Sequence, residues 1–231
     1  MTDQIMSRTT DGEQVRLFPL QGTLLLPGTF LPLNVFEPRY RQLVQHVMGD
    51  DRRIGMIQPC LPSEGEESLK VVDPLRPPLY AVGCVGEVIE CEPQDDGRYL
   101  IVLRGDRRFR VVEELAPDAG GYRRVLADVS GFTEDPLELE KEIEIGRLLA
   151  VAVRFCAARD LEFDIELLAA LAPAQAVNAL CAAVPLPAAE KQALLEAAEP
   201  ESRRDLLTTL LEMQLSDSWQ SQDSVAPPSI N

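Results

Sequence analysis

Few side chains in this sequence are of the types that do chemistry. Among its 231 residues are five cysteines and a single histidine, His46. No two cysteines form a CxxC pair, and one histidine cannot build a His-rich metal site. We therefore predict no metal site and no cofactor. Buried, unpaired thiols are expected at Cys60, Cys84, Cys91, Cys156 and Cys181.

Catalytic motifs are equally scarce. A catalytic serine often stands in a GxSxG turn beside a base, and the sequence lacks that motif. His46 falls off the apolar stripe of its predicted helix, so we expect it on the surface. The GxxxxGK[ST] loop that binds nucleotide phosphates is also missing. We predict no catalytic residues and neither ATPase nor peptidase activity.

Arginine is concentrated in one stretch of an acidic chain. The net charge of −16 repels nucleic acid and anionic lipid on average. The arginines could form an RNA-binding surface, and this alternative stays open. Cross-strand ion pairs with nearby carboxylates explain them more simply. The arginines are Arg98, Arg104, Arg107, Arg108, Arg110, Arg123 and Arg124, and the carboxylates are Glu87, Glu90, Glu92, Asp95 and Asp96.

Aromatic side chains and one charged pair are the candidates for binding an apolar ligand. Glu37 and Arg39 flank a helix start, where they either face a groove or pair locally. The aromatic residues could line a groove for apolar segments of unfolded chains, or they could fill the core of a small barrel. The candidate peptide-binding set is Phe30, Phe36, Glu37, Arg39, Tyr40, Tyr80 and Phe109.

Short strands separated by turns must position these residues. The apolar run from Leu17 to Tyr40 is broken by prolines, each of which fixes φ and removes a backbone donor. A long loop, Pro59 to Pro78, interrupts the pattern. We predict strands at 15–18, 30–36, 53–58, 80–92, 99–103, 109–112 and 122–129, a helix from Pro38 to Gly49, and turns at 95–98 and 105–106.

The pattern becomes helical at Asp135, which precedes proline and has a glutamate three residues later. The apolar face of this first helix is predicted from Leu139, Ile143, Gly146, Leu149 and Val153. Further helices are predicted at 163–171, 174–183, 188–197 and from Pro200 to Leu215. The predicted parts are a disordered N-terminus (1–13), a β-rich subdomain (14–132), a helical subdomain (133–215) and a disordered tail (216–231).

No apolar run is long enough to span a membrane, and the N-terminus has no apolar core like that of a secretory signal. We therefore expect a cytoplasmic protein that does not associate with membranes.

Four blocks of sequence, in order, carry a family resemblance. The stretches FPLQGTLLLPGTFLPLNVFEPRYRQLV and LYAVGCVGEVIECEPQDDGRYLIVLRGDRRFRVVEE are followed by the predicted strand at 122–129 and by LPAAEKQALLEAAEPESRRDLLTTLLEMQ. Together they resemble the LON domain, the N-terminal substrate-recognition domain of Lon-type ATP-dependent proteases. The resemblance covers about residues 14 to 215, and FEPRY is similar to members in which the domain stands alone.

The resemblance implies an α+β fold, in which a PUA-like β pseudo-barrel precedes a C-terminal helical bundle. It also implies a non-catalytic module that binds unfolded or specific protein segments, with a quality-control adaptor as one use. The alternative is an RNA-binding PUA-like module, although the acidic charge disfavours nucleic acid as a partner.

Overall fold

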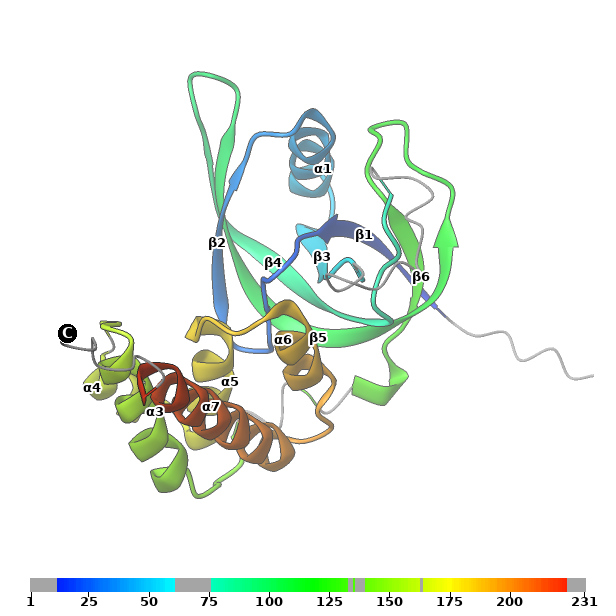
Figure 1. Cartoon of the computed structure of the whole chain (residues 1–231). Helices are drawn as coiled ribbons and strands as arrows, with labels where there is room; N and C mark the ends of the chain where they lie inside the picture. The colour runs from blue at the N-terminus through cyan, green and yellow to red at the C-terminus, as the bar shows by residue number, and fades with distance from the viewer. Residues whose placement is uncertain (1–11, 61–75, 133–134, 136–139, 163, 224–231) are drawn as a thin grey trace, which may run out of the picture. The chain divides into compact units, whose positions relative to one another are not determined.

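The structure is a computed structural model that describes residues 12–60, 76–132, 135, 140–162 and 164–223 (Figure 1). By its contacts the chain divides into two compact units, Met1–Pro136 and Leu137–Asn231. A β-sheet makes up most of the first unit and helices make up the second, which confirms the α+β class. Most of the predicted disordered N-terminus and of the Pro59–Pro78 loop lies outside the described residues.

The first unit contains a six-stranded sheet in the order β2-β5-β4-β3-β1-β6. Its pairs are antiparallel except that β1 and β3 run parallel. The elements are β1 (Glu13–Pro19), β2 (Phe30–Val35), α1 (Pro38–Met48), β3 (Arg53–Ile57), β4 (Val82–Pro93), β5 (Tyr99–Leu115), β6 (Arg124–Asp128) and the 3-10 turn η1 (Ser130–Phe132).

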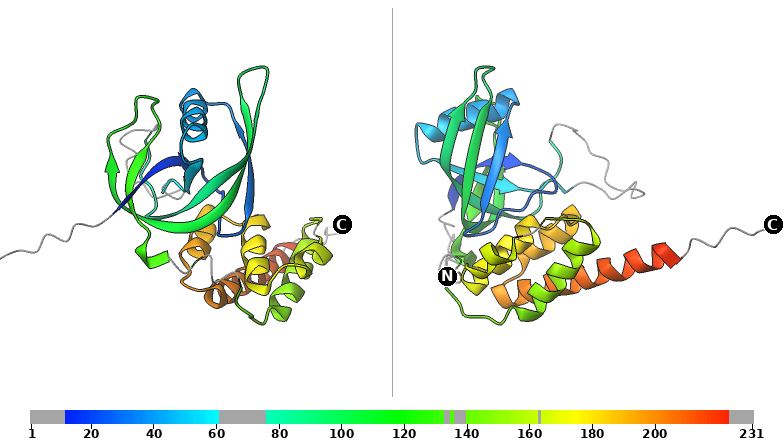
Figure 2. Two further views of the ribbon diagram at one scale, coloured as in Figure 1. Left: turned by 180° about the vertical axis from the view of Figure 1, so that it is seen from behind. Right: turned by 90° about the vertical axis from the view of Figure 1, so that its left-hand side faces the viewer.

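Strand β5 closes the sheet on itself. Its first part pairs with β2 and β4, and its last part, from Arg110 to Leu115, pairs with β6. The ring β5-β4-β3-β1-β6 is therefore a small barrel, and its curvature is visible in Figures 1 and 2. Its core consists of Val15, Leu17, Ile57, Val85, Phe109, Val125 and Ala127.

Ring closure leaves β2 outside the barrel, with one edge unpaired among the described strands. The Gly105 N–H donates to the Thr29 carbonyl at 2.8 Å, so alternate residues from Thr29 onward face β5. By the same alternation the nitrogen of Pro32 faces the free edge. A proline costs no ladder hydrogen bond there, which explains why a strand can hold one.

The predicted turn at Gly105-Asp106 is wrong, because β5 runs through it without a break. A side chain at Gly105 would overlap the Leu26 carbonyl. Glycine is therefore required there by the close approach of two backbones. The pairing register shifts between Val85 and Gly86, which lie opposite Arg107 and Gly105. Asp106 of β5 therefore has no partner on β4 and forms a β-bulge.

Helix α1 begins at Pro38 and is capped by Gly49, as predicted. It lies between the β4–β5 hairpin and the β6 side of the sheet (Figure 1). Gln45 donates to the Tyr99 hydroxyl at 3.0 Å, and the His46 Nδ1 lies 2.8 Å from the Tyr122 hydroxyl. The predicted apolar face is buried: Tyr40, Leu43, Val44 and Val47.

The second unit is a helical bundle in which α7 contacts α3, α5 and α6. Arg203 of α7 is buried and donates to the Asn178 side chain of α5 at 2.6 Å. The helices are α3 (Gly146–Ala158), α4 (Ile165–Ala169), α5 (Pro173–Ala183), α6 (Ala188–Glu196) and α7 (Pro200–Asp223).

Two helix predictions need correction. Asp135 is helical, as predicted, and residues 136–139 lie outside the described part of the chain, but residues 141–145 are not helical. The predicted single helix therefore does not continue to Val153: helix α3 begins at Gly146, and Val153 is 40% exposed. A competing stripe at the same helical spacing is buried instead, formed by Leu148, Val151, Ala152, Phe155 and Cys156. Helix α7 also continues past Leu215 to Asp223, because no proline interrupts this polar stretch.

Candidate peptide-binding surface

Strands β2, β5 and β4 carry one exposed face in register. Residues opposite each other on paired strands point to the same side of a sheet, so the pairing defines rows across the three strands. We call the nine residues of these rows the ribbon face. The rows are Phe30–Arg104–Glu87, Pro32–Val102–Glu90 and Asn34–Leu100–Glu92.

Apolar side chains occupy four of the six positions in the β2 and β5 columns of the ribbon face, and Asn34 and Arg104 occupy the other two. Phe30 is 60% exposed and Leu100 is 43% exposed, while Pro32 is exposed and Val102 half-buried. Phe36 follows at the next outward position of the alternation and is 63% exposed. Exposed apolar side chains in one contiguous patch are characteristic of an interaction surface.

A shallow groove of about 430 Å³ lies on this face. Its lining comes from all three strands, so it runs across them rather than along one. The lining residues are Pro32, Leu33, Asn34, Glu90, Glu92, Leu100, Ile101 and Val102.

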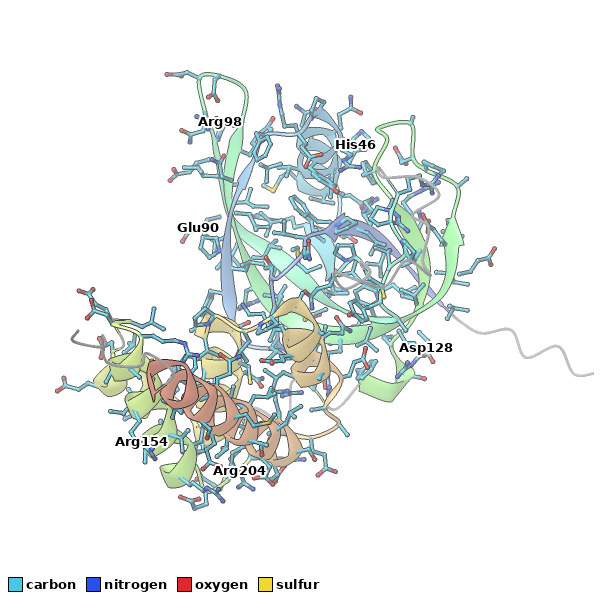
Figure 3. The ribbon with its side chains drawn as sticks, viewed as in Figure 1. His46, Glu90, Arg98, Asp128, Arg154 and Arg204 are labelled. Carbon is cyan, nitrogen blue, oxygen red and sulfur yellow. The ribbon has the colours of Figure 1, made fainter. Side chains whose placement is uncertain are left out.

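The charge on the ribbon face is uneven. Glu87 accepts a hydrogen bond from Arg104 at 2.6 Å, so this row is neutral. Glu90 and Glu92 are exposed, and neither forms an ion pair with any residue of the described chain. Glu90 lies on the side of the ribbon away from α1 (Figure 3). Cys91 alternates to the other side, where burial raises the pKa of its thiol against the opposing influence of Arg52.

The structure separates the seven predicted binding residues. Phe30 lies on the ribbon face, with Phe36 directly beyond β2. Phe109 is fully buried in the barrel core, and Tyr40 is 5% exposed and stacked on Phe18 with ring centroids 4.1 Å apart. Tyr40 and Phe109 are therefore core residues: Tyr40 is on the buried face of α1, and Phe109 fills the small barrel.

Glu37 and Arg39 pair with each other at the β2–α1 junction. The Arg39 Nη2 lies 2.9 Å from the Glu37 carboxylate, and its guanidinium lies over the Tyr40 ring. This arrangement corresponds to the local-pairing alternative for these two residues. It leaves neither charge directed at the groove.

Tyr80 lies elsewhere, in a second cavity of about 290 Å³. This cavity shares no lining residue with the groove on the ribbon face. Its polar wall is the ion pair between Arg123 and Glu114, with an N–O distance of 2.6 Å. The predicted set therefore does not form one site.

The arginine cluster is largely neutralised by the chain's own carboxylates. Arg104 pairs across strands with Glu87, and Arg98 pairs with Asp96 within the hairpin turn, both of them carboxylates of the predicted set. Four other arginines pair with carboxylates outside that set: Arg107–Glu13, Arg108–Asp135, Arg123–Glu114 and Arg124–Asp118.

His46 is exposed, as predicted, and contacts Tyr122 and Asp118. Its Nδ1 lies 3.8 Å from the Asp118 carboxylate, whose pKa is lowered mainly by the Gly120 backbone N–H. No trio of His, Cys, Asp or Glu side chains in the described ranges could hold a metal ion. No helix among the described residues is both long and apolar enough to cross a membrane.

The residues that the sequence analysis missed are Pro32, Leu100 and Val102 of the groove floor. The period-two alternation of strand residues 30–36 and 99–103 was a usable signal, because it separates two faces. Which face is covered depends on α1 and on barrel closure, and neither follows from local spacing.

The described chain is a barrel with an added edge strand, followed by helices. A sequence profile of the ATP-dependent protease La (LON) substrate-binding domain matches residues 14–213. The chain belongs to this family, as the resemblance predicted. The matched domain is named for binding substrate, not for catalysis.

Similar proteins agree with this assignment. Lon protease of Parabacteroides distasonis is 28% identical over 191 residues, which are 80% of this chain and 22% of that protein. Lon protease 2 of Myxococcus xanthus is 29% identical over 204 residues, 84% of this chain and 23% of that protein. The chain therefore spans less than a quarter of the length of these relatives.

Solved structures show the same fold. A Lon N-terminal domain protein from Xanthomonas campestris is 25% identical with a TM-score of 0.58, and the match covers 88% of this chain and 98% of that one. The N-terminal domain of the Mycobacterium avium complex Lon protease has a TM-score of 0.53 at 16% identity, covering 87% and 98% of the two chains.

Proposed function

We propose that this chain binds extended segments of other proteins on its ribbon face. The observation that carries the proposal is the exposed apolar patch, with Phe30 in its first row and Leu100 in its last, beside the free edge of β2. Membership of a substrate-binding family supports the same use of the domain. The groove, which runs across the strands, would select among side chains, and the free edge of β2 would offer a second mode, main-chain pairing that tolerates many sequences.

Such binding is expected to be weak and broad. Pro32 removes one donor from the free edge, so an added strand finds fewer partners than on an ideal edge. Burying an exposed aromatic or leucine side chain contributes about 1.5–3 kcal/mol each. Two such anchors, set against the cost of association, give affinities on the order of micromolar to millimolar.

The chain is proposed to act without catalysis, as a binding module or adaptor in protein quality control. The sequence lacks a nucleotide-phosphate loop, and its one histidine contacts a tyrosine and an aspartate. A cytoplasmic location stays a prediction.

RNA is the weaker candidate ligand. Binding to a phosphate backbone requires unneutralised Lys or Arg side chains gathered on a surface. Here Arg104, Arg107 and Arg123 lie within ion-pair distance of carboxylates of the same chain. Titration with a labelled single-stranded RNA at low salt is expected to show no shift.

The test of peptide binding is titration of labelled unfolded casein against the chain, with a folded protein as the control ligand. The variant Phe30→Ser/Leu100→Ser is expected to lose binding about tenfold or more. The control variant Val112→Ser/Leu167→Ser removes two other exposed apolar side chains and should bind like the wild type. Absence of binding by the wild type, or equal losses in both variants, would contradict the proposal.

The absence of catalysis has its own test. Purified chain is expected to turn over neither ATP nor a labelled casein substrate. Turnover that follows the chain through successive purification steps would overturn this part of the proposal.

A further inference from the structure

The ribbon face pairs an apolar column with an acidic one. We propose that the segment it accepts carries a basic side chain within one or two residues of an apolar side chain. The basic group would lie between Glu90 and Glu92, and the apolar group over Leu100 and Val102. This inference rests on the proposed function and specifies the class of segment that is bound.

The acidic and apolar columns are close enough together for two nearby side chains of one peptide segment to contact both. Leu100 lies opposite Glu92, and Val102 lies opposite Glu90. Adjacent strands are about 4.8 Å apart, and residues two apart on a strand are separated by about 6.7 Å. An ammonium or guanidinium group between the two carboxylates therefore reaches both, while a neighbouring side chain rests on the apolar column. The groove of about 430 Å³ joins the two columns, since residues of both line it.

Charge complementarity identifies the occupant. Glu87 at the end of the acidic column is neutralised by Arg104, and Arg98 in the adjoining hairpin turn is paired with Asp96. The unpaired negative charge therefore falls on Glu90 and Glu92. The net charge of −16 adds a longer-range preference for basic over acidic segments.

Other occupants fit this face less well. An acidic peptide or a nucleic-acid phosphate would meet two carboxylates. A second copy of this chain, paired edge to edge through β2, would offer Phe30, Pro32 and Asn34. None of these side chains is a cation, so self-association would leave Glu90 and Glu92 without a partner.

The experiment compares three labelled peptides by fluorescence anisotropy. In the first, Arg stands two residues from Leu or Phe with Ser between them, so that both side chains point to the same side of an extended chain. In the second and third, Glu or Gln replaces Arg. The wild type is expected to bind the Arg peptide about threefold to tenfold more tightly than the Gln peptide, as two exposed ion pairs allow. The Glu peptide should bind most weakly, and the differences should shrink as salt is raised.

Variants assign the preference to the two carboxylates. Glu90→Gln/Glu92→Gln should abolish the preference for Arg, and Glu90→Lys/Glu92→Lys should reverse it in favour of the Glu peptide. The control variant Glu113→Gln/Glu162→Gln removes the same charge from exposed positions outside the groove and should keep the preference.

The outcomes separate the two proposals. If no peptide binds, the proposed function fails. If all three bind equally, or if Glu90→Gln/Glu92→Gln retains the preference, this inference fails while peptide binding stands. Sedimentation of the chain alone provides a further check. Self-association that Phe30→Ser/Leu100→Ser abolishes would assign the face to a second copy and overturn the inference.

Discussion

Arg108 and Asp135 form a buried ion pair joined at several points. The Arg108 Nη2 and Nε donate to the Asp135 carboxylate at 2.6 and 2.9 Å, and the Arg108 backbone N–H donates to it at 2.8 Å. The two side chains are only 2% and 3% exposed. The guanidinium also lies over the Phe132 ring. The pair fixes Asp135, at the end of the first unit, to the middle of β5.

Removing one partner of this pair should be costly. Asp135→Ala leaves the Arg108 guanidinium buried without its carboxylate, and we expect the free energy of unfolding to fall by about 3–5 kcal/mol. Urea unfolding followed by far-ultraviolet circular dichroism, which reports the sheet of the first unit, measures this. Glu87→Gln, which breaks the exposed pair with Arg104, should cost about 1 kcal/mol or less. Similar losses in the two variants would refute a structural role for the buried pair.

The same pair shows what the sequence could and could not predict. Asp135, followed by Pro136 and Glu138, fits a helix start, and local spacing gives no sign of a partner 27 residues earlier. The positions of most strands and helices could be predicted from prolines, glycines and the alternation of apolar residues, as Pro38 and Gly49 show for the two ends of α1. Which of these residues are buried depends on contacts between parts of the chain that are far apart in the sequence. Phe30 and Phe109 are both strand phenylalanines, but only Phe109 lies inside the closed ring.

Gly105 provides a test of the uninterrupted β5 strand. Gly105→Ala would place a methyl group against the Leu26 carbonyl, and neither backbone can move without breaking ladder bonds. We expect a loss of about 2–4 kcal/mol in the free energy of unfolding, as for other steric strain in a packed core. Gly131→Ala has open space around the added atom and should change stability by about 0.5 kcal/mol or less. A neutral Gly105→Ala would show that the two backbones are not in contact.

The five thiols should react in two groups. Burial raises the pKa of Cys181 to about 12, against the opposing influence of Arg203, so almost no thiolate exists at pH 8. Cys84 and Cys156 are also buried, whereas Cys60 and Cys91 are half-buried. We expect iodoacetamide to label Cys60 and Cys91 in the native protein and the other three only in denaturant. Peptide mass mapping identifies the sites, and rapid native labelling of Cys181 would contradict its burial.

Glu114 should contribute to acid sensitivity. Burial alone would raise its pKa, but hydrogen bonds from Arg123 and Arg76 outweigh this and hold the pKa below its ordinary value of 4.5. A lowered pKa stabilises the folded state above the ordinary value, and this contribution is lost as pH falls through the lowered one. Glu114→Gln should therefore be less stable than the wild type at pH 7, with the difference shrinking below about pH 4. A difference in the free energy of unfolding that stays constant across this pH range would contradict the role of Glu114. The control is Glu113→Gln, at an exposed position.

Arg203 joins three helices of the second unit. It donates to the Leu194 carbonyl at 3.1 Å, to the Asn178 side chain at 2.6 Å and to the Ala197 carbonyl at 3.3 Å. Arg203→Met keeps most of the side-chain volume but removes these three hydrogen bonds. We expect a loss of about 2–4 kcal/mol.

Hydrogen exchange locates the effect of Arg203→Met. Amides of α5 and α6 should exchange faster, while those of the barrel keep their protection, because the lost bonds lie within the helical unit. Arg154→Met, at an exposed position of α3 (Figure 3), should leave both patterns unchanged. Uniformly faster exchange over both units would mean that they unfold together, and unchanged exchange would show that these hydrogen bonds add no stability. Because the ribbon face belongs to the first unit, peptide binding should survive Arg203→Met as long as that unit stays folded.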